Sequence, residues 1–492
     1  MTTNDQQITP ADAAIVSSGT GTKGPEERDL PASLKEEMDL CLQILREVLG
    51  EFDEQLLASF DEVRGYALNA SAERFAGILT DTNPDQDDLQ NVVNTVDKLD
   101  MHDAQLLARA FATYFHLANL CEENYRVSVL HKRETAVDEN QAVDPVNEMT
   151  GAYHQLINEL GPAKARDLLD KLEFHPVFTA HPTEARRKAV EGKIRRISCL
   201  LEAHKLLGGS DKKENSRRLF NEIDALFRTS PIALKNPTPV EEADTILDIF
   251  DNTLFYTIPQ VYRRFDDWVL GDKAGLVPPM CPAFFHPGSW IGSDRDGNPN
   301  VTAKVSRQVA RKFSDHVLGA LEIETRTVGK NLTMEAGTTP PSDELKSLWN
   351  HQKEMSERLT DKAALISTKE MHRAVMLVMA DRLHYTIERD ADLMYHSCDE
   401  FLDAANAKRS AYGPLQDLIW QTETFGFHMV EMEFRQHSVV HSRALEDIRE
   451  HGLHGERGPL QPMTHEVLDT FRALGAIQKR NGIKAARRYI IS

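Results

Sequence analysis

Pro176-Val-Phe-Thr-Ala180 is the first of four short segments that interrupt an otherwise helical sequence. The segments are apolar or alternating, and their length of four to six residues favours β-strands over helices. Long helical stretches separate them, so hairpins are excluded and parallel pairing through helical crossovers is favoured. The other three segments are Ala283-Phe-Phe-His286 running on to Ser289-Trp-Ile291, Met429-Val-Glu-Met-Glu-Phe434 and Arg488-Tyr-Ile-Ile491.

The first three segments lead directly into clusters of polar and charged residues. A (β/α) barrel builds its site in this way, at the carboxyl ends of eight parallel strands. We therefore expect a mostly α protein with a few parallel strands, namely the N-terminal half of a (β/α)8 TIM-like barrel with large helical insertions. The expected divisions are a disordered tail over 1–30, a helical region over 31–172 and the half-barrel over 173–492, truncated at its C-terminus.

The helical stretches carry start and stop signals. Ser33-x-x-Glu36 has the form of a capping box, and Pro237-Thr-Pro239 predicts the start of a helix that runs to about Leu270. Pro259 lies inside that second stretch and predicts a kink or an interruption, because proline lacks the backbone N–H.

Composition excludes several classes of protein. The 492 residues include 57 Lys+Arg and 77 Asp+Glu, a net charge of −20, which argues against general nucleic-acid binding and against an anionic membrane surface. The five cysteines are far apart with no C-x-x-C, so we expect a reducing cytoplasmic location and neither a disulfide framework nor a zinc ribbon. No apolar run approaches the ~20 residues of a membrane helix, and residues 1–24 lack the apolar region of a signal peptide.

The first polar cluster contains His181, which precedes a proline and is therefore biased to an extended backbone at a strand end. Arg186, Arg187 and Lys188 bring cationic groups into the first turns of the next helix, whose N-terminus itself attracts anions. A histidine beside such groups can act as acid, base or electrostatic stabiliser on a substrate that carries phosphate or carboxylate. Taken alone, the cluster fits a histidine packed under a basic, solvated helix face at least as well.

The second cluster is Gly288-Ser-Trp-Ile-Gly-Ser-Asp-Arg-Asp-Gly-Asn-Pro299. Its glycines permit tight turns and a close approach of the backbone to a ligand, while Asp294, Arg295 and Asp296 concentrate charge beside Trp290. The segment lacks the Gly-Lys-Ser/Thr of a P-loop, and it lacks the Gly and Glu that an EF-hand loop requires. A structural turn in which an aspartate pairs with Arg295 is the alternative.

The third cluster, Glu433-Phe-Arg-Gln-His-Ser438, places Arg435 after a strand, from which its guanidinium can project into a barrel mouth. Taken singly, Arg435 fits a surface or salt-bridged arginine better. All three clusters lie on one rim if the strands form a barrel. A purely structural explanation is sufficient for each cluster alone, but it is less convincing for three such clusters at strand ends together.

Three stretches, in this order along the chain, resemble motifs of bacterial and plant phosphoenolpyruvate carboxylases. They are Phe178-Thr-Ala-His-Pro-Thr-Glu184, the segment from Gly288 to Pro299, and Phe434-Arg-Gln-His-Ser438. The first two motifs are long and specific, and the resemblance runs from about residue 30 to the last residue, so the chain is identified as a member of this family.

The resemblance implies that the chain takes part in the carboxylation of phosphoenolpyruvate by bicarbonate. That reaction yields oxaloacetate for the tricarboxylic acid cycle, together with phosphate, and uses Mg²⁺ or Mn²⁺. By the same resemblance, two residues are catalytic: His181 handles the carboxyphosphate stage and Arg435 contacts the substrate phosphate. Five further residues match segments that contact anions or shape the site: Arg187, Trp290, Asp294, Arg295 and Asp296.

The chain also departs from the family. Ser293, His437 and Glu431 stand where the family usually has a glycine, an acidic residue and a basic residue. Family chains extend well beyond this length, and the resemblance places the metal ligands in their second half, so no metal ligand is assigned among these residues. The resemblance implies a homotetramer for the full-length protein, and we expect the 492-residue chain alone to be inactive.

Two other interpretations stay open at this point. The chain is a non-catalytic helical fragment or interaction module derived from the family, or it is an unrelated phosphate-binding barrel enzyme. The three ordered motifs argue against the second of these. The reading frame beyond codon 492 tests the first, because a continuing frame would favour an incomplete enzyme and a stop codon would favour a separate fragment.

Overall fold

The computed structural model of the protein describes residues 30–80, 87–138, 149–179, 188–230, 237–364, 369–406 and 413–492. The chain forms two compact units, which we call the helical unit (Met1–Val143 and Thr183–Asn236) and the sheet unit (Asp144–Pro182 and Pro237–Ser492). Each unit is described by itself.

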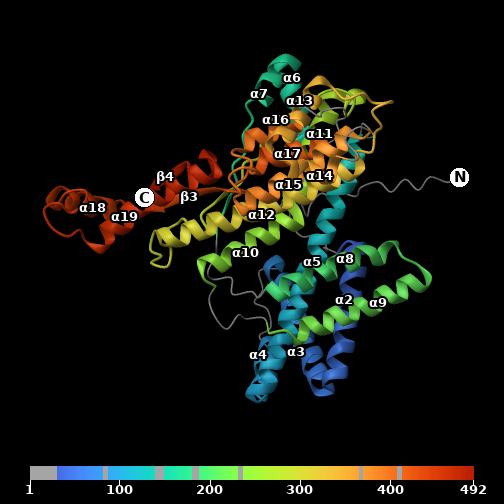
Figure 1. The fold of residues 1–492 in the computed structure, drawn as a ribbon. Coiled ribbons are helices and arrows are strands. Elements are labelled where there is room, and N and C mark those ends of the chain that lie inside the picture. Colours follow the sequence, from blue (N-terminus) through green and yellow to red (C-terminus); the bar gives the residue numbers. More distant parts are fainter. Residues whose placement is uncertain are drawn as a thin grey trace. The chain divides into compact units, whose positions relative to one another are not determined.

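The described residues of the helical unit form helices and their connections (Figure 1). Leu45, Leu117, Ile197 and Ile223 are fully or almost fully buried in a core to which five of these helices contribute. The first helix begins at Ala32 without a side-chain cap, so Ser33 lies inside the helix and the predicted capping box is wrong. The helices are α2 (Ala32–Phe52), α3 (Glu54–Thr80), α4 (Asp87–Val96), α5 (Met101–Asp138), α8 (Lys188–Leu206) and α9 (Gly209–Arg228).

The sheet unit contains a larger set of helices packed around one apolar core. Two of its helices, α12 and α15, run alongside each other and pack together (Figure 1). Its helices are α6 (Met149–Leu160), α7 (Pro162–Leu169), α10 (Pro239–Ile249), η1 (Phe250–Leu254), α11 (Phe255–Leu270), η2 (Gly271–Lys273), α12 (Ala303–Asn331), α13 (Asp343–Met355), α14 (Glu357–Ala364), α15 (Met371–Glu388), α16 (Cys398–Asn406), α17 (Pro414–Phe425), α18 (Ser438–His451), α19 (Pro462–Asn481) and η3 (Ile483–Ala486).

The expected helix after Pro237 begins with a capping box between Thr238 and Glu241. It is interrupted before Pro259 by the π-helical turn η1, after which α11 contains the proline. Proline cannot donate to the carbonyl four residues earlier, and the wider turn just before it adapts the helix to that missing bond. None of the helices in the described part of the chain is long and apolar enough to cross a membrane.

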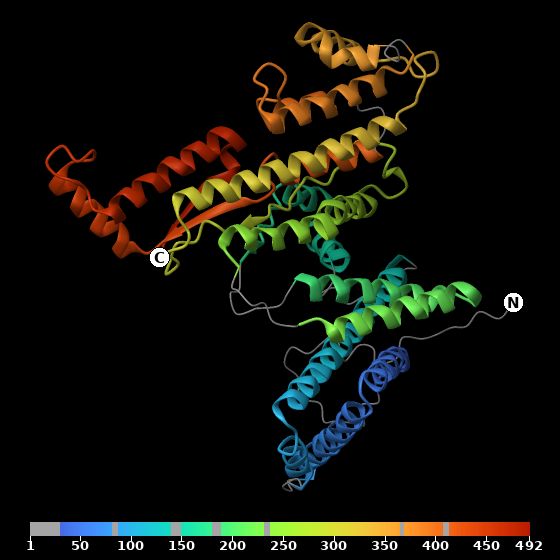
Figure 2. The same cartoon turned by 60° about the horizontal axis from the view of Figure 1, so that its bottom comes forward.

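All four predicted strand segments contribute to one parallel sheet with the order β1-β2-β3-β4. The sheet runs beside α18 and α19 in the C-terminal part of the unit (Figure 2). The prediction of a mostly α protein with a few parallel strands is therefore confirmed, while closure into a barrel stays a prediction. The strands are β1 (Val177–Phe178), β2 (Gly288–Ser289), β3 (Glu431–Gln436) and β4 (Arg488–Ile491).

Three strands differ in their bounds from the sequence prediction, and β1 covers only Val177–Phe178 of the expected segment 176–180. Strand β3 begins two residues later than expected, because Met429 has a positive φ of 66° and Val430 donates its N–H to the carbonyl of His428 in a turn. Strand β2 is short, because Pro287 has no N–H to donate between the pairing at Phe285 and the pairing at Gly288.

The two faces of the sheet differ in character, because alternate residues of a strand point to opposite sides. Met432 and Phe434 belong to the apolar core, and Tyr489 stacks on Phe434 and on Phe471 of α19, at ring distances of 6.4 Å and 5.0 Å. The opposite face carries charged side chains, which come from Glu431, Glu433, Arg435 and Arg488. This polar face supports the candidate site.

Candidate functional site

Arg435 lies near the carboxyl end of β3, where the loop after β2 joins it. The carbonyl of Arg435 accepts the N–H of Arg295 at 2.9 Å, and its own N–H donates to the carbonyl of Ser293 at 3.2 Å. The loop is thereby fixed against the end of β3. Arg435 is within the strand rather than after it, because β3 continues to Gln436, two residues beyond the predicted end at Phe434.

Three of the predicted site residues surround the Arg435 guanidinium. It forms ion pairs with Asp294 at 3.4 Å and with Asp296 at 2.8 Å, and it lies 5.3 Å from the centre of the Trp290 ring. About a quarter of each charged side chain is exposed, at 28% for Arg435 and 26% and 24% for the aspartates. The structure therefore brings Trp290, Asp294, Asp296 and Arg435 together at the carboxyl ends of the strands, in reach of a solute.

Arg295 points elsewhere. It is only 6% exposed, and its guanidinium lies 5.1 Å from the ring centre of Phe434, whose side chain is on the opposite face of β3 from Arg435. It donates to Ser306 Oγ at 2.7 Å and to the Ser293 carbonyl at 3.2 Å. Burial lowers the pKa of this guanidinium. These contacts fasten the loop to α12, and a substrate-binding role for Arg295 stays a prediction.

His181 and Arg187 lie outside the described residues. The chain approaches that segment along β1, and the carbonyl of Phe178 accepts the N–H of Trp290 at 2.9 Å. The last described residue before the segment is Thr179. The catalytic role expected of His181 and the anion contact expected of Arg187 stay predictions.

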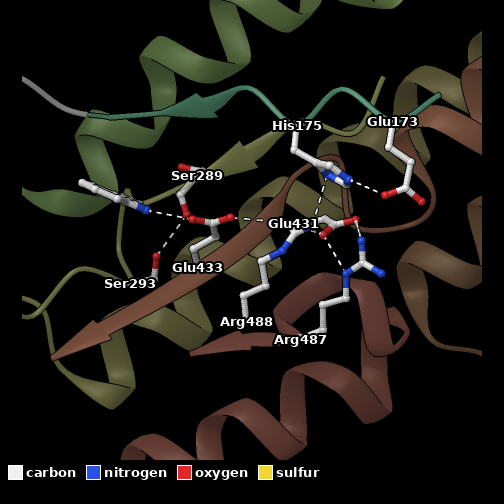
Figure 3. Close-up of polar contacts among 9 residues, drawn as sticks. Glu173, His175, Ser289, Ser293, Glu431, Glu433, Arg487 and Arg488 are labelled. Atoms are coloured by element: carbon white, nitrogen blue, oxygen red, sulfur yellow. Dashed lines mark hydrogen bonds and ion pairs between the residues drawn. The ribbon is translucent and has the colours of Figure 1, made fainter. Parts of the chain in front are cut away.

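A buried ionic network lies on the polar face of the sheet, and the sequence interpretation missed it. Glu431 bonds to Arg487 at 2.9 Å and 3.1 Å and to Arg488 at 2.7 Å. Arg488 also reaches Glu433 at 3.4 Å and His175 Nδ1 at 3.2 Å (Figure 3). The alternation of Glu431, Glu433 and Arg435 along one strand is the signal that could have revealed a charged face.

Two histidines near this network are held neutral. Burial lowers the pKa of His286 to about 4, with further effects from Lys484 and His175, and its ring stacks on His175 at 4.9 Å. Burial, Lys484 and Arg487 together lower the pKa of His428 to about 3. Burial is the main cause of both shifts, and the nearby charges of Lys484 and Arg487 further disfavour a protonated histidine here.

A comparison with known proteins identifies the family to which the chain belongs. A sequence model of the phosphoenolpyruvate carboxylases matches residues 34–455, which is most of the chain and includes the site residues Trp290, Asp294, Asp296 and Arg435. The chain belongs to the phosphoenolpyruvate carboxylase family.

Curated phosphoenolpyruvate carboxylases are similar to this chain at a moderate level of identity. The enzyme of Roseiflexus castenholzii is 29% identical over 446 residues, which cover 80% of this chain and 47% of the relative. Those of Synechococcus sp. and Medicago sativa are each 28% identical, covering 82% and 90% of this chain and 47% and 50% of the relatives. The chain thus spans about half the length of the curated phosphoenolpyruvate carboxylases it matches.

The residues described do not fit the metal that the phosphoenolpyruvate carboxylase family implies. Across the described ranges, no group of three or more His, Cys, Asp or Glu side chains is arranged to hold an ion. Asp294 and Asp296 both bond to Arg435, so their carboxylates do not form an open site. The steps proposed for this chain therefore use its own side chains and none of them passes through Mg²⁺ or Mn²⁺.

The three departures from phosphoenolpyruvate carboxylase motifs each have a structural role. Ser293 is fully buried and donates its hydroxyl to the Ser289 carbonyl at 3.2 Å. His437 is the N-cap of α18 and accepts the Val439 N–H on Nδ1, as an acidic residue would on its carboxylate. Glu431 is paired with Arg487 and Arg488, so its negative charge is balanced on the polar face of the sheet.

Proposed function

We propose that this chain supplies the phosphate-contacting side of a phosphoenolpyruvate carboxylase, which forms oxaloacetate and phosphate from phosphoenolpyruvate and bicarbonate. The observation that carries the proposal is the position of Arg435 at the carboxyl ends of parallel strands in a chain of this family. There its guanidinium contacts the ring of Trp290 and pairs with Asp294 and Asp296. A guanidinium forms paired hydrogen bonds to phosphate or carboxylate, which are the groups that phosphoenolpyruvate carries.

The net charge around Arg435 indicates that the site needs further positive groups to bind an anionic substrate. Arg435 contributes one positive charge and the two aspartates two negative charges, which gives a net charge of −1 around the guanidinium. These three groups alone would not attract an anionic substrate. We infer that the aspartates orient Arg435, and that further cations complete the site, with Arg187 as the candidate from this chain.

In the proposed reaction, Arg435 binds the phosphate and offsets the negative charge that grows as phosphorus is attacked. The indole face of Trp290 excludes water from one side of the guanidinium, so the charge interaction with substrate is less screened. His181 is assigned to the later carboxyphosphate stage, where it stabilises or transfers a proton to the departing groups. The roles of Arg435 and His181 are carried over from the family resemblance, and the role of Trp290 is inferred from its contact with Arg435.

The architecture proposed for the whole enzyme is a closed barrel. We propose that β1 to β4 are the first four strands of a (β/α)8 barrel over residues 173–492, interrupted by large helical insertions such as α8 and α9. The metal ligands then belong to the part of the relatives that this chain does not cover. We further propose a cytoplasmic homotetramer for the full-length protein, and no carboxylation by the 492-residue chain alone.

The test uses the protein translated from the whole reading frame that contains these 492 residues, which we call the complete gene product. Oxaloacetate formation is coupled to NADH oxidation, in the presence and absence of bicarbonate and Mg²⁺. We expect Arg435→Lys to raise the KM for phosphoenolpyruvate about tenfold or more, because an ammonium cannot form the paired contacts of a guanidinium. The matched control is Arg480→Lys, at a half-buried arginine that pairs with Asp315 outside the sheet.

His181→Asn tests the second assigned role. We expect this variant to form no oxaloacetate while it still binds phosphoenolpyruvate, because the histidine is assigned to a step after the first attack. If the complete gene product neither binds nor consumes phosphoenolpyruvate, the alternative of a non-catalytic helical module derived from the family takes the place of this proposal.

A further inference from the structure

We propose that Glu433 is a positioning residue of the candidate site, because it holds the Trp290 indole in the place from which the indole supports Arg435. The inference rests on the proposed function for its effect on substrate, and on geometry alone for its effect on Trp290. Neither the family match nor the sequence interpretation assigns a role to Glu433.

The carboxylate of Glu433 makes a direct contact with the indole. Trp290 Nε1 donates its hydrogen to Glu433 Oε2 at 3.0 Å, and the carboxylate is only 10% exposed. An indole has a single hydrogen-bond donor, so this bond fixes the rotation of the ring. The same ring lies 5.3 Å from the Arg435 guanidinium. A negative acceptor on the indole N–H also makes the ring face more attractive to a cation.

The carboxylate is itself held from the other side. The parallel register places Arg488 opposite Glu433, and Arg488 reaches Oε1 at 3.4 Å while it bonds to Glu431 at 2.7 Å. Figure 3 shows the chain of contacts that runs from Arg487 through Glu431 and Arg488 to Glu433. Position 288 is a glycine, and a Cβ there would lie in van der Waals contact with Glu433 Oε1 at 3.6 Å, so the carboxylate lies close to the backbone of β2.

Arg435 is therefore held on two sides by groups that do not move independently. Asp294 and Asp296 fix its nitrogens, and the indole fixed by Glu433 supports its face. Without Glu433 the indole gains rotational freedom, and the guanidinium loses the surface that keeps it in one orientation. The expected consequence is weaker binding of an anion at Arg435, with little change in the chemical steps that follow.

The first readout is the indole itself. The chain has four tryptophans, so incorporation of 5-fluorotryptophan into the 492-residue chain gives four ¹⁹F resonances, and Trp290→Phe assigns the one from Trp290. We expect Glu433→Leu to shift and broaden that resonance and to leave the other three unchanged. Glu433→Gln keeps an acceptor oxygen for the indole, so we expect a smaller shift and a partial rescue.

The second readout is substrate affinity in the complete gene product. We expect Glu433→Leu to raise the KM for phosphoenolpyruvate about tenfold, with kcat changed less than about twofold. A tenfold change in KM corresponds to the contribution of about one hydrogen bond. In the Trp290→Phe background the same substitution is expected to have no further effect, because Glu433 then has no indole to hold. Glu400→Gln is the control, since it breaks a pair between a partly exposed glutamate and the buried Arg382, on helices that carry no site residue.

The outcomes separate this inference from the proposed function. An unchanged Trp290 resonance in Glu433→Leu, or additive effects of Glu433→Leu and Trp290→Phe on KM, overturns the inference. Absence of any response of the wild-type protein to phosphoenolpyruvate overturns the proposed function, while a shifted resonance would still establish that Glu433 positions the indole. If Glu433→Leu fails to fold, Glu433→Gln decides by the same two readouts.

Discussion

Glu431 accepts two hydrogen bonds from the Arg487 guanidinium, at 2.9 Å and 3.1 Å, although only 3% of its side chain is exposed. Arg488 adds a third bond at 2.7 Å. A carboxylate buried to this extent is costly unless it is fully paired, so its stability contribution depends on both arginines. The two arginines come from the segment before β4 and from its first residue, so the network joins β3 to β4.

Glu431→Gln is expected to destabilise the protein by about 3 kcal/mol, because it leaves two arginines beside a neutral amide on the polar face of the sheet. Urea denaturation followed by circular dichroism measures the change in the free energy of unfolding. Arg472→Gln is the control, since it breaks an exposed pair with Asp469 and is expected to cost less than about 0.5 kcal/mol. Equal losses in the two variants would contradict a special role for the buried network.

The four strands and their parallel order could be predicted from the sequence, because each strand is a short apolar or alternating run with long helices on both sides. The meeting of Trp290 with Arg435 could be predicted too, since carboxyl ends of parallel strands share one edge. In both cases local pattern and chain direction are sufficient.

Other features depend on contacts that no local pattern specifies. Glu433 and Arg488 are 55 residues apart and meet only because of the register between β3 and β4. Arg295 turns to Phe434 and Ser306, whereas its neighbours in the loop turn to Arg435, and only the packing of α12 decides between the two directions. Ser33 has the spacing of a cap, but the helix already begins at Ala32, directly after Pro31, which places the serine inside it.

Stability is expected to fall as the pH is lowered from about 6.5, because His428 is neutral in the folded protein. Its folded pKa of about 3 lies below the value of 6.5 expected in the unfolded chain, so between these values the unfolded chain binds a proton that the folded protein does not. The free energy of unfolding therefore rises with pH across this window, by at most about 1.4 kcal/mol per pH unit from this group, and levels off above it.

His428→Gln is expected to reduce this pH dependence between pH 4.5 and 6.5 by about 2 kcal/mol, as measured by urea denaturation at each pH. His454→Gln, at an exposed histidine, is the control and is expected to leave the slope unchanged. Glu431 and the arginines of the network remain in both variants, so an unchanged slope in His428→Gln would mean that another group is responsible.

Exposed cysteines are expected to react faster than buried ones. Cys41 and Cys121 are buried with their sulfurs 3.7 Å apart, and this mutual contact together with burial raises the pKa of the Cys41 thiol. Burial also raises the pKa of Cys398 to about 12, whereas Cys199 is exposed. We expect Cys199 to be alkylated in the native protein roughly a hundredfold faster than Cys41, because only thiolates in contact with solvent react quickly.

Mass spectrometry after a short pulse of iodoacetamide identifies the modified residues. Cys199→Ser is expected to remove the fast phase, and unfolding in urea is expected to expose the remaining cysteines. Labelling of Cys41 at the rate of Cys199 in the native protein would contradict the packing of α2 against α5.

The loop that carries Asp294 and Asp296 contains two glycines with a left-handed backbone. Gly292 and Gly297 have nearly the same left-handed φ, 71° and 74°, but their surroundings differ. A Cβ at Gly292 would lie 2.6 Å from Val309 Cγ2 in α12, whereas a Cβ at Gly297 would meet nothing within 4 Å. Both alanine variants are expected to lose about 1 kcal/mol to the backbone conformation, and Gly292→Ala is expected to lose about 2 kcal/mol more from the clash.

Denaturation of the two variants gives the difference directly, and Val309→Ala then tests its cause. Removing the Val309 methyl groups costs stability by itself, because the side chain is fully buried. In the Gly292→Ala background, however, the same removal relieves the contacts of the new Cβ with Val309 Cγ2 and Cγ1 and leaves the contact with Val309 Cβ at 2.9 Å. The double variant is therefore expected to be more stable than the sum of the single losses predicts. Additive losses would mean that Gly292→Ala is destabilised by its backbone alone, and that the loop is not seated on α12 at this point.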